Sequence, residues 1–304
     1  MKIDIEKLRR SGVITATARE TTKQMIRPGV KLEAVALAAE KIIRDMGGEP
    51  AFPAQLSRNN IAAHYCSPPG DPTEAQEGDI IKIDMGTHVD GWVTDSATTV
   101  DLRDGTASLL VQASEMALEN AISVMGPGAS ITEIGRQIES TIKAMGFTPV
   151  YNLTGHGVAR YCIHCKPSIP NYPDPKAVTL RPGQTVACEP FACDGRGSIR
   201  EQGAAEVFML VRTPKTKELK KLPTDVAAAL EATERLPFAR RTLLRHLDSP
   251  AKVDQALDLL RKLRMIVEFP PLVEQSGIRV AQTEHTIFIH EDGAEVLTRT
   301  PAGV

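Results

Sequence analysis

The feature that most constrains this chain is an internal repeat within its first two hundred residues. Residues 28–50 read PGVKLEAVALAAEKIIRDMGGEP, and residues 127–149 read PGASITEIGRQIESTIKAMGFTP. Both segments have apolar residues at helical spacing, begin at a Pro-Gly turn and end at a glycine suited to a helix C-terminus, Gly47 or Gly146. The sequence therefore predicts two equivalent helices at an offset of 99 residues.

Polar residues continue the correspondence beyond these helices. His64 matches His164 at an offset of 100, and Asp84 matches Glu189 at an offset of 105. Each of these two carboxylates follows a glycine turn by six residues, on an otherwise apolar strand. Chance is the alternative explanation, because short helices and strands resemble one another. A two-fold pseudo-repeat would bring Asp84 and Glu189 towards a common centre.

One segment, residues 212–275, has no counterpart in the first half. It carries helical patterns, each opened by a capping residue or a proline, over residues 224–235, 237–247 and 250–263. We expect an inserted helical subdomain here, with a winged-helix-like arrangement as one option. The catalytic domain would then comprise residues 1–211 and 276–304, and residues 278–289 would return to its sheet as one strand.

Composition narrows the class of protein. The chain has 304 residues, 42% of them hydrophobic, and a formal net charge of −2. It is therefore too apolar to be disordered and has no overall basic charge that would favour nucleic acid. Its cysteines number five, an odd count in a long chain, so a disulfide framework is not expected, and no apolar run is long enough for a membrane span. We expect a cytoplasmic protein without a membrane partner, and nothing in the sequence demands more than a monomer.

Two aspartates flank a hairpin signal. Asp84 and Asp95 lie on β-like segments joined by residues 87–91, which end in Asp90-Gly91. With a two-residue turn, paired residue numbers sum to an odd value, so the two aspartates share a face, about 4.5–8 Å apart. Buried carboxylates this close need a cation between them. A solvated loop is the simpler alternative.

Further candidate ligands strengthen the metal interpretation. His156 lies between two glycines, and Glu189 and Glu284 lie on otherwise apolar strands, where a carboxylate needs a partner. Two Asp, two Glu and one His suit two divalent ions such as Co, Mn, Fe or Zn. Such dinuclear sites are typical of hydrolases, aminopeptidases among them.

The chain resembles the methionine aminopeptidases of type 2, which have the pita-bread fold. The resemblance covers nearly the whole chain and is carried by Asn59-Asn60-Ile61-Ala62-Ala63-His64-Tyr65, Lys82-Ile83-Asp84-Met85-Gly86, Asp90-Gly91-Trp92-Val93-Thr94-Asp95, Gly155-His156, Ile163-His164, Ile169-Pro170-Asn171, Glu189-Pro190-Phe191 and Gln282-Thr283-Glu284-His285-Thr286-Ile287. The eight-residue step from His156 to His164 and the helical insert fit type 2. The short N-terminal segment is similar to that of archaeal members. The implied fold class is α+β, an antiparallel sheet with a pseudo-two-fold repeat, covered by helices.

The resemblance implies a set of site residues. The metal ligands would be Asp84, Asp95, His156, Glu189 and Glu284, with Asp95 and Glu284 bridging two ions. Asp84 would complete one ion's site, and His156 with Glu189 the other. A metal-activated hydroxide would attack the scissile carbonyl.

The remaining roles concern the substrate. Glu189 would carry a proton to the leaving amine, and His164 would stabilise charge on the carbonyl oxygen. His64 would position the substrate amide. Phe52 and Ile163 would line the pocket for the methionine side chain. The implied function is removal of the initiator methionine from nascent polypeptide N-termini, preferentially when the next residue is small.

Some residues depart from the family pattern or have simpler explanations. Cys162, Cys165 and Lys166-Pro167 depart from the family pattern, in which a small pair such as Ala-Gly is expected after the second histidine. A structural zinc site at these cysteines is not expected. Gly195-Arg196-Gly197 is interpreted as a hairpin turn. Of the other histidines, His285 is expected to pack on the face opposite Glu284, and His88, His246 and His290 are expected at the surface.

Two alternative functions remain open. One is a proline-specific peptidase of the same fold, of the prolidase or aminopeptidase P type. Those enzymes usually carry a sizeable domain ahead of the repeat and lack the insert. The other is a non-catalytic module that binds the ribosome or RNA through the insert. Residues 212–275 contain 13 basic and 9 acidic residues, against 23 and 29 in the remainder.

Overall fold

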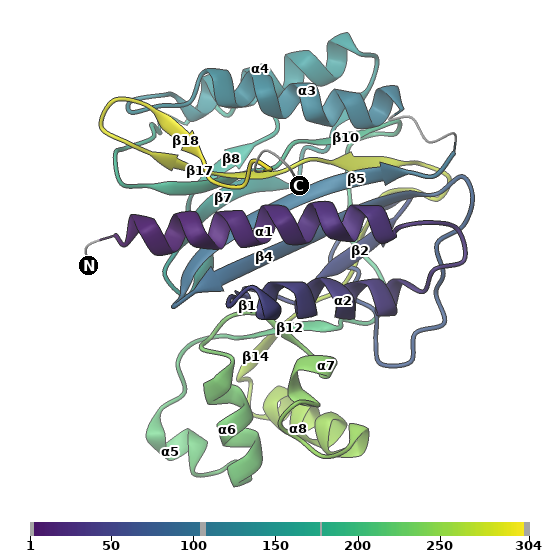
Figure 1. Cartoon of the computed structure of the whole chain (residues 1–304), viewed down its shortest axis with the longest axis vertical. Coiled ribbons are helices and arrows are strands. Elements are labelled where there is room, and N and C mark those ends of the chain that lie inside the picture. The colour runs from purple at the N-terminus through teal and green to yellow at the C-terminus, as the bar shows by residue number, and fades with distance from the viewer. Residues whose placement is uncertain (1–2, 104–107, 177, 301–304) are drawn as a thin grey trace.

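The computed structural model describes residues 3–103, 108–176 and 178–300, and it is an α+β protein with antiparallel sheets (Figure 1). The first half of the chain contains α1 (Ile5–Met25), α2 (Leu32–Asp45), β1 (Glu49–Pro50), β2 (Gln55–Arg58), β3 (Ile61–Ala63), β4 (Ile80–Val89) and β5 (Trp92–Asp101). The second half repeats this order with α3 (Leu109–Ser123), α4 (Ile131–Ala144), β6 (Thr148–Pro149), β7 (Thr154–Ala159), β8 (Cys162–Pro170), β9 (Thr185–Cys188) and β10 (Phe191–Cys193).

The predicted repeat is present in the backbone. Helices α2 and α4 are both 14 residues long and end before Gly47 and Gly146, which have φ values of 81° and 84°. Only glycine adopts this left-handed conformation without strain, so each glycine ends its helix. Each Pro-Gly turn is held by an equivalent bond, from the Gly29 N–H to Ala75 and from the Gly128 N–H to Leu180. The expectation of two equivalent helices is confirmed.

Each half has its own apolar core beneath its helices. Leu32, Val35 and Ile43 of α2 pack with the apolar face of β4, and Ile134, Ile138 and Ile142 of α4 are buried over β9 and β17 (His285–Ile289). Burial of these helix faces is the main force that holds helices and sheets together.

The two halves are joined along β5 and the strands that follow the insert. Strand β5 pairs with β4, β16 (Val280–Gln282) pairs with β10, and β17 pairs with β9 and with β18 (Ala294–Val296). Across the junction, Ser96 donates a hydrogen bond to the Glu284 carbonyl at 2.7 Å, and the Glu284 N–H donates to Ala97 at 2.9 Å. First-half and second-half strands are therefore locked together beside Glu284.

The insert forms a separate lobe, below α2 and opposite α3 and α4 in Figure 1. It contains β12 (Val207–Leu210), α5 (Thr216–Leu219), α6 (Thr224–Ala232), β13 (Phe238–Ala239), α7 (Arg240–Leu243), α8 (Pro250–Lys262) and β14 (Ile266–Phe269). Its strands form an antiparallel sheet in the order β13-β12-β14, and its core gathers side chains such as Phe208, Phe238 and Leu257. One strand of this sheet, β12, lies just before residue 212, so the lobe begins a few residues ahead of the expected boundary.

The insert's helices differ from the sequence pattern. The helix expected over residues 237–247 is reduced to α7, because Phe238 and Ala239 pair with β12 as β13. The helix expected over residues 224–235 ends at Ala232, ahead of Glu234 and Arg235, which both have positive φ. Pairing with a neighbouring strand overrides local helical spacing here.

Other expectations were wrong. Residues 278–289 do not form one strand, since Thr283 and Glu284 separate β16 from β17. Gly195-Arg196-Gly197 is not a hairpin turn, because β10 does not pair with β11 (Arg200–Glu201), which pairs instead with β15 (Leu272–Val273). The Arg196 and Ser198 N–H groups donate to the buried carboxylate of Glu274.

Of the histidines expected at the surface, His88 is buried. Its Nδ1 accepts a hydrogen bond from the Gly91 N–H at 3.1 Å, and its ring packs edge-on against Tyr161. Within the described residues, no helix combines the length and apolar character needed to cross a membrane.

Candidate metal centre

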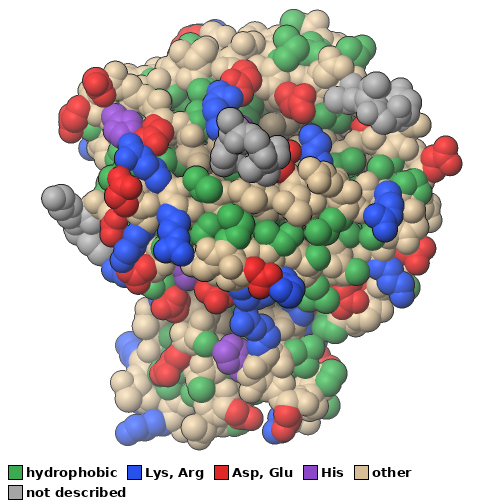
Figure 2. Space-filling model, in the orientation of Figure 1, with side chains coloured by type: hydrophobic (Ala, Val, Ile, Leu, Met, Phe, Trp, Pro, Cys, Tyr) green, Lys and Arg blue, Asp and Glu red, His purple; other side chains and the backbone are tan. Residues whose placement is uncertain are grey.

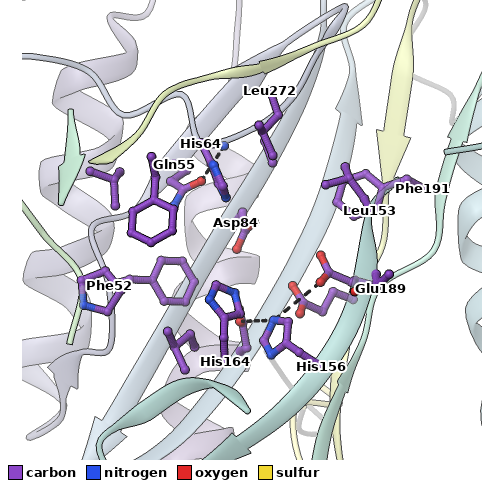
Figure 3. Close-up of a pocket in the computed structure, with 18 of the residues that line it drawn as sticks. Phe52, Gln55, His64, Asp84, Leu153, His156, His164, Glu189, Phe191 and Leu272 are labelled. Atoms are coloured by element: carbon purple, nitrogen blue, oxygen red, sulfur yellow. Dashed lines mark hydrogen bonds and ion pairs between the residues drawn. The ribbon is translucent and has the colours of Figure 1, made fainter. Parts of the chain in front are cut away.

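A cavity of about 520 Å³ opens where the two halves and the insert meet. Its polar wall contains Asp84, Asp95, His156, Glu189 and Glu284, together with His64 and His164. Figure 3 shows His156 and Glu189 facing Asp84 across the cavity, with the two other histidines beside them. All seven polar residues expected at the site therefore line one space.

The two aspartates reach the cavity from the β4–β5 hairpin. Asp90 and Gly91 form its turn with φ values of 51° and 81°, as a two-residue turn requires. In the resulting register Asp84 lies opposite Ala97, and Asp95 lies opposite Gly86. The two carboxylates are thus diagonal neighbours on one face, as the parity of their numbers predicts.

His156 and Glu189 come from the second half, on β7 and directly after β9. The His156 Nε2 lies 3.7 Å from Asp95 Oδ2 and 3.6 Å from Glu189 Oε1, while its Nδ1 lies 3.2 Å from the Gly157 carbonyl. Burial lowers the pKa of His156 to about 3, so the ring is neutral. Because the Nδ1–H donates a hydrogen bond to the Gly157 carbonyl, Nε2 presents a lone pair towards the carboxylates.

Glu284 occupies the break between β16 and β17. Its backbone is bonded to Ala97 and Ser96, and its side chain is 1% exposed. One ligand atom each from Asp95, His156 and Glu284 lies within 4.8 Å of the others. The break that interrupts the strand therefore places a carboxylate against the ligands of both halves.

Among the described residues, no lysine or arginine forms an ion pair with these carboxylates, although Lys166 also lines the cavity. Burial first, and then repulsion from neighbouring carboxylates, raises the pKa of Asp95, Glu189 and Glu284 well above ordinary values. Burial raises the pKa of Asp84 to about 7. Buried carboxylates this close together stay ionised only when cations bind between them.

The hydrogen bonding supports the same conclusion. Asp84 Oδ1, Asp95 Oδ1 and both carboxylate oxygens of Glu284 are buried without a hydrogen-bond partner among the described residues. Buried oxygens are almost always paired, so these atoms are available for a ligand. Four carboxylates and one neutral imidazole form a donor set that fits divalent metal ions.

His64 and His164 stand beside these ligands. The His64 backbone has a φ of 66° and its N–H donates to Gln55 at 2.8 Å, while burial lowers the pKa of its ring to about 4. The His164 ring packs edge-on against His156 with centroids 4.3 Å apart, and burial lowers its pKa. Strained backbone of the His64 kind persists where the surroundings impose it, commonly at functional sites.

The apolar part of the cavity adjoins the ligands. Phe52 and Ile163 are both buried in one cluster with Val93 and Ala187, and both line the cavity. Phe52 packs so closely over Gly86 that a Cβ at this glycine would lie 2.5 Å from its ring. The insert completes the wall with Pro237 and Phe269, which the sequence did not suggest.

Sequence reasoning assigned no role to Gln282. This side chain is fully buried, and its Nε2 donates to Asp84 Oδ2 at 3.3 Å and to Glu189 Oε2 at 3.2 Å. Its position two residues before Glu284 was the one indication in the sequence of a place near the site. Because its amide is uncharged, there was no reason to expect a role for it from the sequence.

The cysteines near His164 take no part in the ligand group. Cys162 donates a weak hydrogen bond to the His164 carbonyl at 3.4 Å. Cys165 lines the cavity, and burial raises the pKa of its thiol to about 11. No cysteine belongs to the metal-holding group found in the described part of the chain.

Curated relatives match this chain over nearly its whole length. A methionine aminopeptidase of Archaeoglobus fulgidus is 40% identical over 294 residues, which cover 97% of this chain and 98% of the relative. One of Methanothermobacter thermautotrophicus is 38% identical over 297 residues, with the same coverage of each chain.

Solved structures share the fold. The methionine aminopeptidase of Thermotoga maritima superposes with a TM-score of 0.70 at 25% identity, covering 98% of each chain. A thermophilic Arx1 superposes with a TM-score of 0.83 at 17% identity, covering all of this chain and 93% of the other, which bears on fold alone. The expected pita-bread fold is confirmed. A family model matches residues 6–212, and this chain belongs to metallopeptidase family M24.

Proposed function

We propose that this chain is a methionine aminopeptidase that removes the initiator methionine from newly made polypeptides, preferentially when the next residue is small. The observation that carries the proposal is the cavity itself, where five ligand-type side chains meet beside an apolar pocket. Relatives identical at 38–40% over nearly the full chain support the same activity.

We propose Asp84, Asp95, His156, Glu189 and Glu284 as ligands of two divalent ions. When bound, such ions activate water and polarise a carbonyl group near neutral pH. The unpartnered oxygens of Asp84, Asp95 and Glu284 support this assignment. The identity of the ions, whether Co, Mn, Fe or Zn, is not specified by the donor set, because all four accept oxygen and imidazole ligands.

The other side chains would bind and orient the peptide. Phe52 and Ile163 would hold the methionine side chain in the apolar part of the cavity. His64, neutral because of its burial, would position the substrate amide. His164 would donate a hydrogen bond to the carbonyl oxygen as negative charge develops there. Glu189 would transfer a proton to the leaving amine.

Finer assignments follow from the family resemblance. We propose that the chain is of type 2 and archaeal-like, that residues 212–275 form an inserted subdomain within a catalytic domain of residues 1–211 and 276–304, and that the protein acts as a cytoplasmic monomer on nascent N-termini. The core shared by α6 and α8 supports the subdomain, and β12, which completes that core, lies just before residue 212. Residues 1–2 and 301–304 lie outside the described part of the chain.

A ribosome contact through the insert is a weaker proposal. The insert has an excess of four basic residues, 13 against 9. Figure 2 shows basic and acidic side chains interspersed over the face displayed, the insert included. We therefore expect association, where it occurs, to weaken with added salt. Association that does not respond to salt would contradict this electrostatic basis.

The proline-specific alternative rests on fold alone. A prolidase of Pyrococcus furiosus superposes with a TM-score of 0.64 at 17% identity, and this chain covers 65% of it. Near-full-length relatives of much higher identity are methionine aminopeptidases.

Peptide cleavage separates these functions. The protein is stripped with a chelator, reloaded with Mn²⁺ or Co²⁺, and given a Met-Gly peptide or an X-Pro peptide. We expect methionine release from the first peptide, only after reloading. Cleavage of the X-Pro peptide with the Met-Gly peptide left intact would contradict the proposal.

A further inference from the structure

Gln282 is held rigidly at the end of β16. Its side chain is 0% exposed, and its backbone is clamped on both sides by one hydroxyl of β5. Thr99 Oγ1 accepts a hydrogen bond from the Gln282 N–H at 2.9 Å and donates one to the Gln282 carbonyl at 2.7 Å. The direction in which this side chain leaves the strand is therefore fixed by the junction between the two halves.

The amide of Gln282 reaches one carboxylate from each half of the repeat. Its Nε2 lies 3.3 Å from Asp84 Oδ2 and 3.2 Å from Glu189 Oε2. These two residues are the pair that the repeat relates to each other, and the proposed ligand set divides them between the two ion sites. Gln282 therefore connects the two sites through a single nitrogen.

The second oxygen of each carboxylate is left for other contacts. Asp84 Oδ1 is buried without a hydrogen-bond partner, and Glu189 Oε1 lies 3.6 Å from His156 Nε2. Because a carboxylate is planar, binding one oxygen to Gln282 fixes where the other points. An amide is also uncharged, so it orients both carboxylates without neutralising them, which a lysine or arginine in its place would do.

We propose that Gln282 is a positioning residue of the metal centre, which orients Asp84 and Glu189 so that one oxygen of each faces the ions. This inference rests on the metal centre assigned under the proposed function. Side chains that orient ligands in this way typically change metal affinity by about 10- to 100-fold when they are replaced.

The test is metal binding by the full-length protein without peptide. Gln282→Met keeps the side-chain length and removes the donor, whereas Gln282→Asn keeps the amide but is one methylene too short to reach both carboxylates. Metal-free wild type and both variants are titrated with Mn²⁺ by calorimetry, and the spin coupling between bound Mn²⁺ ions is recorded by electron paramagnetic resonance.

We expect two ions in the wild type with coupled spins. In both variants we expect at least one dissociation constant to rise about 10- to 100-fold and the coupling to weaken or disappear. Two-ion binding with unchanged affinities and coupling in either folded variant would overturn the proposal. Because no peptide is present, this result is independent of which peptide bond the enzyme cleaves.

Gln55→Met is the matched control. Gln55 is also a buried amide that lines the cavity, and it lies opposite Asp84 in the β2–β4 register. Its side-chain oxygen, however, accepts from the His64 N–H, and none of the described hydrogen bonds joins its side chain to a carboxylate. We expect both Mn²⁺ affinities to stay within about twofold of wild type. An equal loss in this control would show that any amide in the cavity supports the centre, which would also overturn a specific role for Gln282.

Discussion

At the scale of single residues, the proposed metal centre is defined by carboxylates that are buried away from water and that repel one another. The pKa of Asp84 is raised to about 7, and that of Asp95 is raised well above its ordinary value by burial and by its neighbours. Protons and metal ions therefore compete for the same oxygens. The imidazole of His156 is neutral over the whole physiological range and presents no such competition.

This competition predicts how metal affinity depends on pH. A raised pKa means that Asp84 holds its proton below about pH 7 and must release it when a cation binds, so affinity should rise with pH. Between pH 6 and 7, we expect the Mn²⁺ affinity to rise about tenfold per pH unit if binding releases one proton. Calorimetry in buffers of different ionisation enthalpy checks both the affinity and the proton release. A constant affinity from pH 6 to 8 would show that these groups are already ionised.

A second prediction concerns the two proposed catalytic side chains. Glu189→Gln and His164→Ala should each lower kcat by about 100-fold or more, because each acts on charge that develops in the transition state. KM for a Met-Gly peptide should change much less. Steady-state kinetics at saturating Mn²⁺ measure both constants, and the metal content of each variant is the control. A rise in KM alone would place the residue in substrate binding.

Charge determined which of these residues could be recognised in the sequence. Asp84 and Asp95 stood out because two acids on an apolar hairpin need a reason, and the parity of their numbers placed them on one face. Gln282 carries no charge, so its place between Asp84 and Glu189 could be seen only in the folded chain. His88 was misplaced because its burial depends on the distant ring of Tyr161.

At the scale of elements, interruptions in the strands determine where the site residues lie. The break between β16 and β17 turns Glu284 into the cavity, and the register shift between His156 and Gly157 of β7 lets β8 bulge beside the imidazole. Gly157 permits this bulge, since a Cβ there would lie 2.5 Å from the Lys166 carbonyl oxygen. Local periodicity predicts an unbroken strand because it contains no information on partners.

A buried ion pair between Arg241 and Glu40 anchors the insert to the first half of the chain. Arg241 of α7 is 8% exposed and donates to Glu40 of α2 at 2.7 and 2.9 Å, to the Ala54 carbonyl at 2.8 Å, and to Ser67 and Cys66. Arg241→Met removes these bonds and leaves the buried Glu40 carboxylate with only the Arg44 guanidinium at 3.3 Å and the Ala54 N–H at 3.2 Å. Because the carboxylate keeps these two partners, we expect a loss of about 1.5–3 kcal/mol of stability at this contact.

Hydrogen exchange measures this loss, with faster exchange expected in residues 207–269. Arg245→Met is the matched control, because Arg245 is half exposed and its nitrogen lies 3.9 Å from Glu49. We expect the control to change stability by less than about 0.5 kcal/mol. Equal effects of the two variants would mean that apolar contacts, and not the ion pair, hold the insert in place.

At the scale of the whole molecule, the proposed metal ligands divide between two related halves. Asp84 and Asp95 belong to the first, and His156 and Glu189 to the second, while Glu284 lies between the two strands that return after the insert, β16 and β17. The repeat in the sequence predicted the equivalent helices and the convergence of Asp84 with Glu189. It could not predict the insert's cavity residues Pro237 and Phe269, which have no counterpart in the first half.

Metal ions shared between the halves should stabilise their junction. With free Mn²⁺ at 100 times its dissociation constant, binding to the folded state adds about 2.7 kcal/mol, or roughly 100-fold slower exchange through global opening. We expect the largest slowing at the amides of Glu284 and Asp95, which bond across the junction to Ala97 and to Thr286. Exchange in α8 of the insert should change little. Equal slowing in both regions would indicate that the lobes open as one unit.

The position of Glu284 also determines when the centre can exist during translation. The ribosome makes Asp84, Asp95, His156 and Glu189 first, then the insert, and only then Gln282 and Glu284. The insert's core can form from its own contiguous stretch while the ribosome is still elongating the chain. The earlier carboxylates must wait for the returning strands. Until then the growing polypeptide lacks the last of the proposed ligands, so we expect metal capture and activity to begin only after Glu284 has emerged and docked.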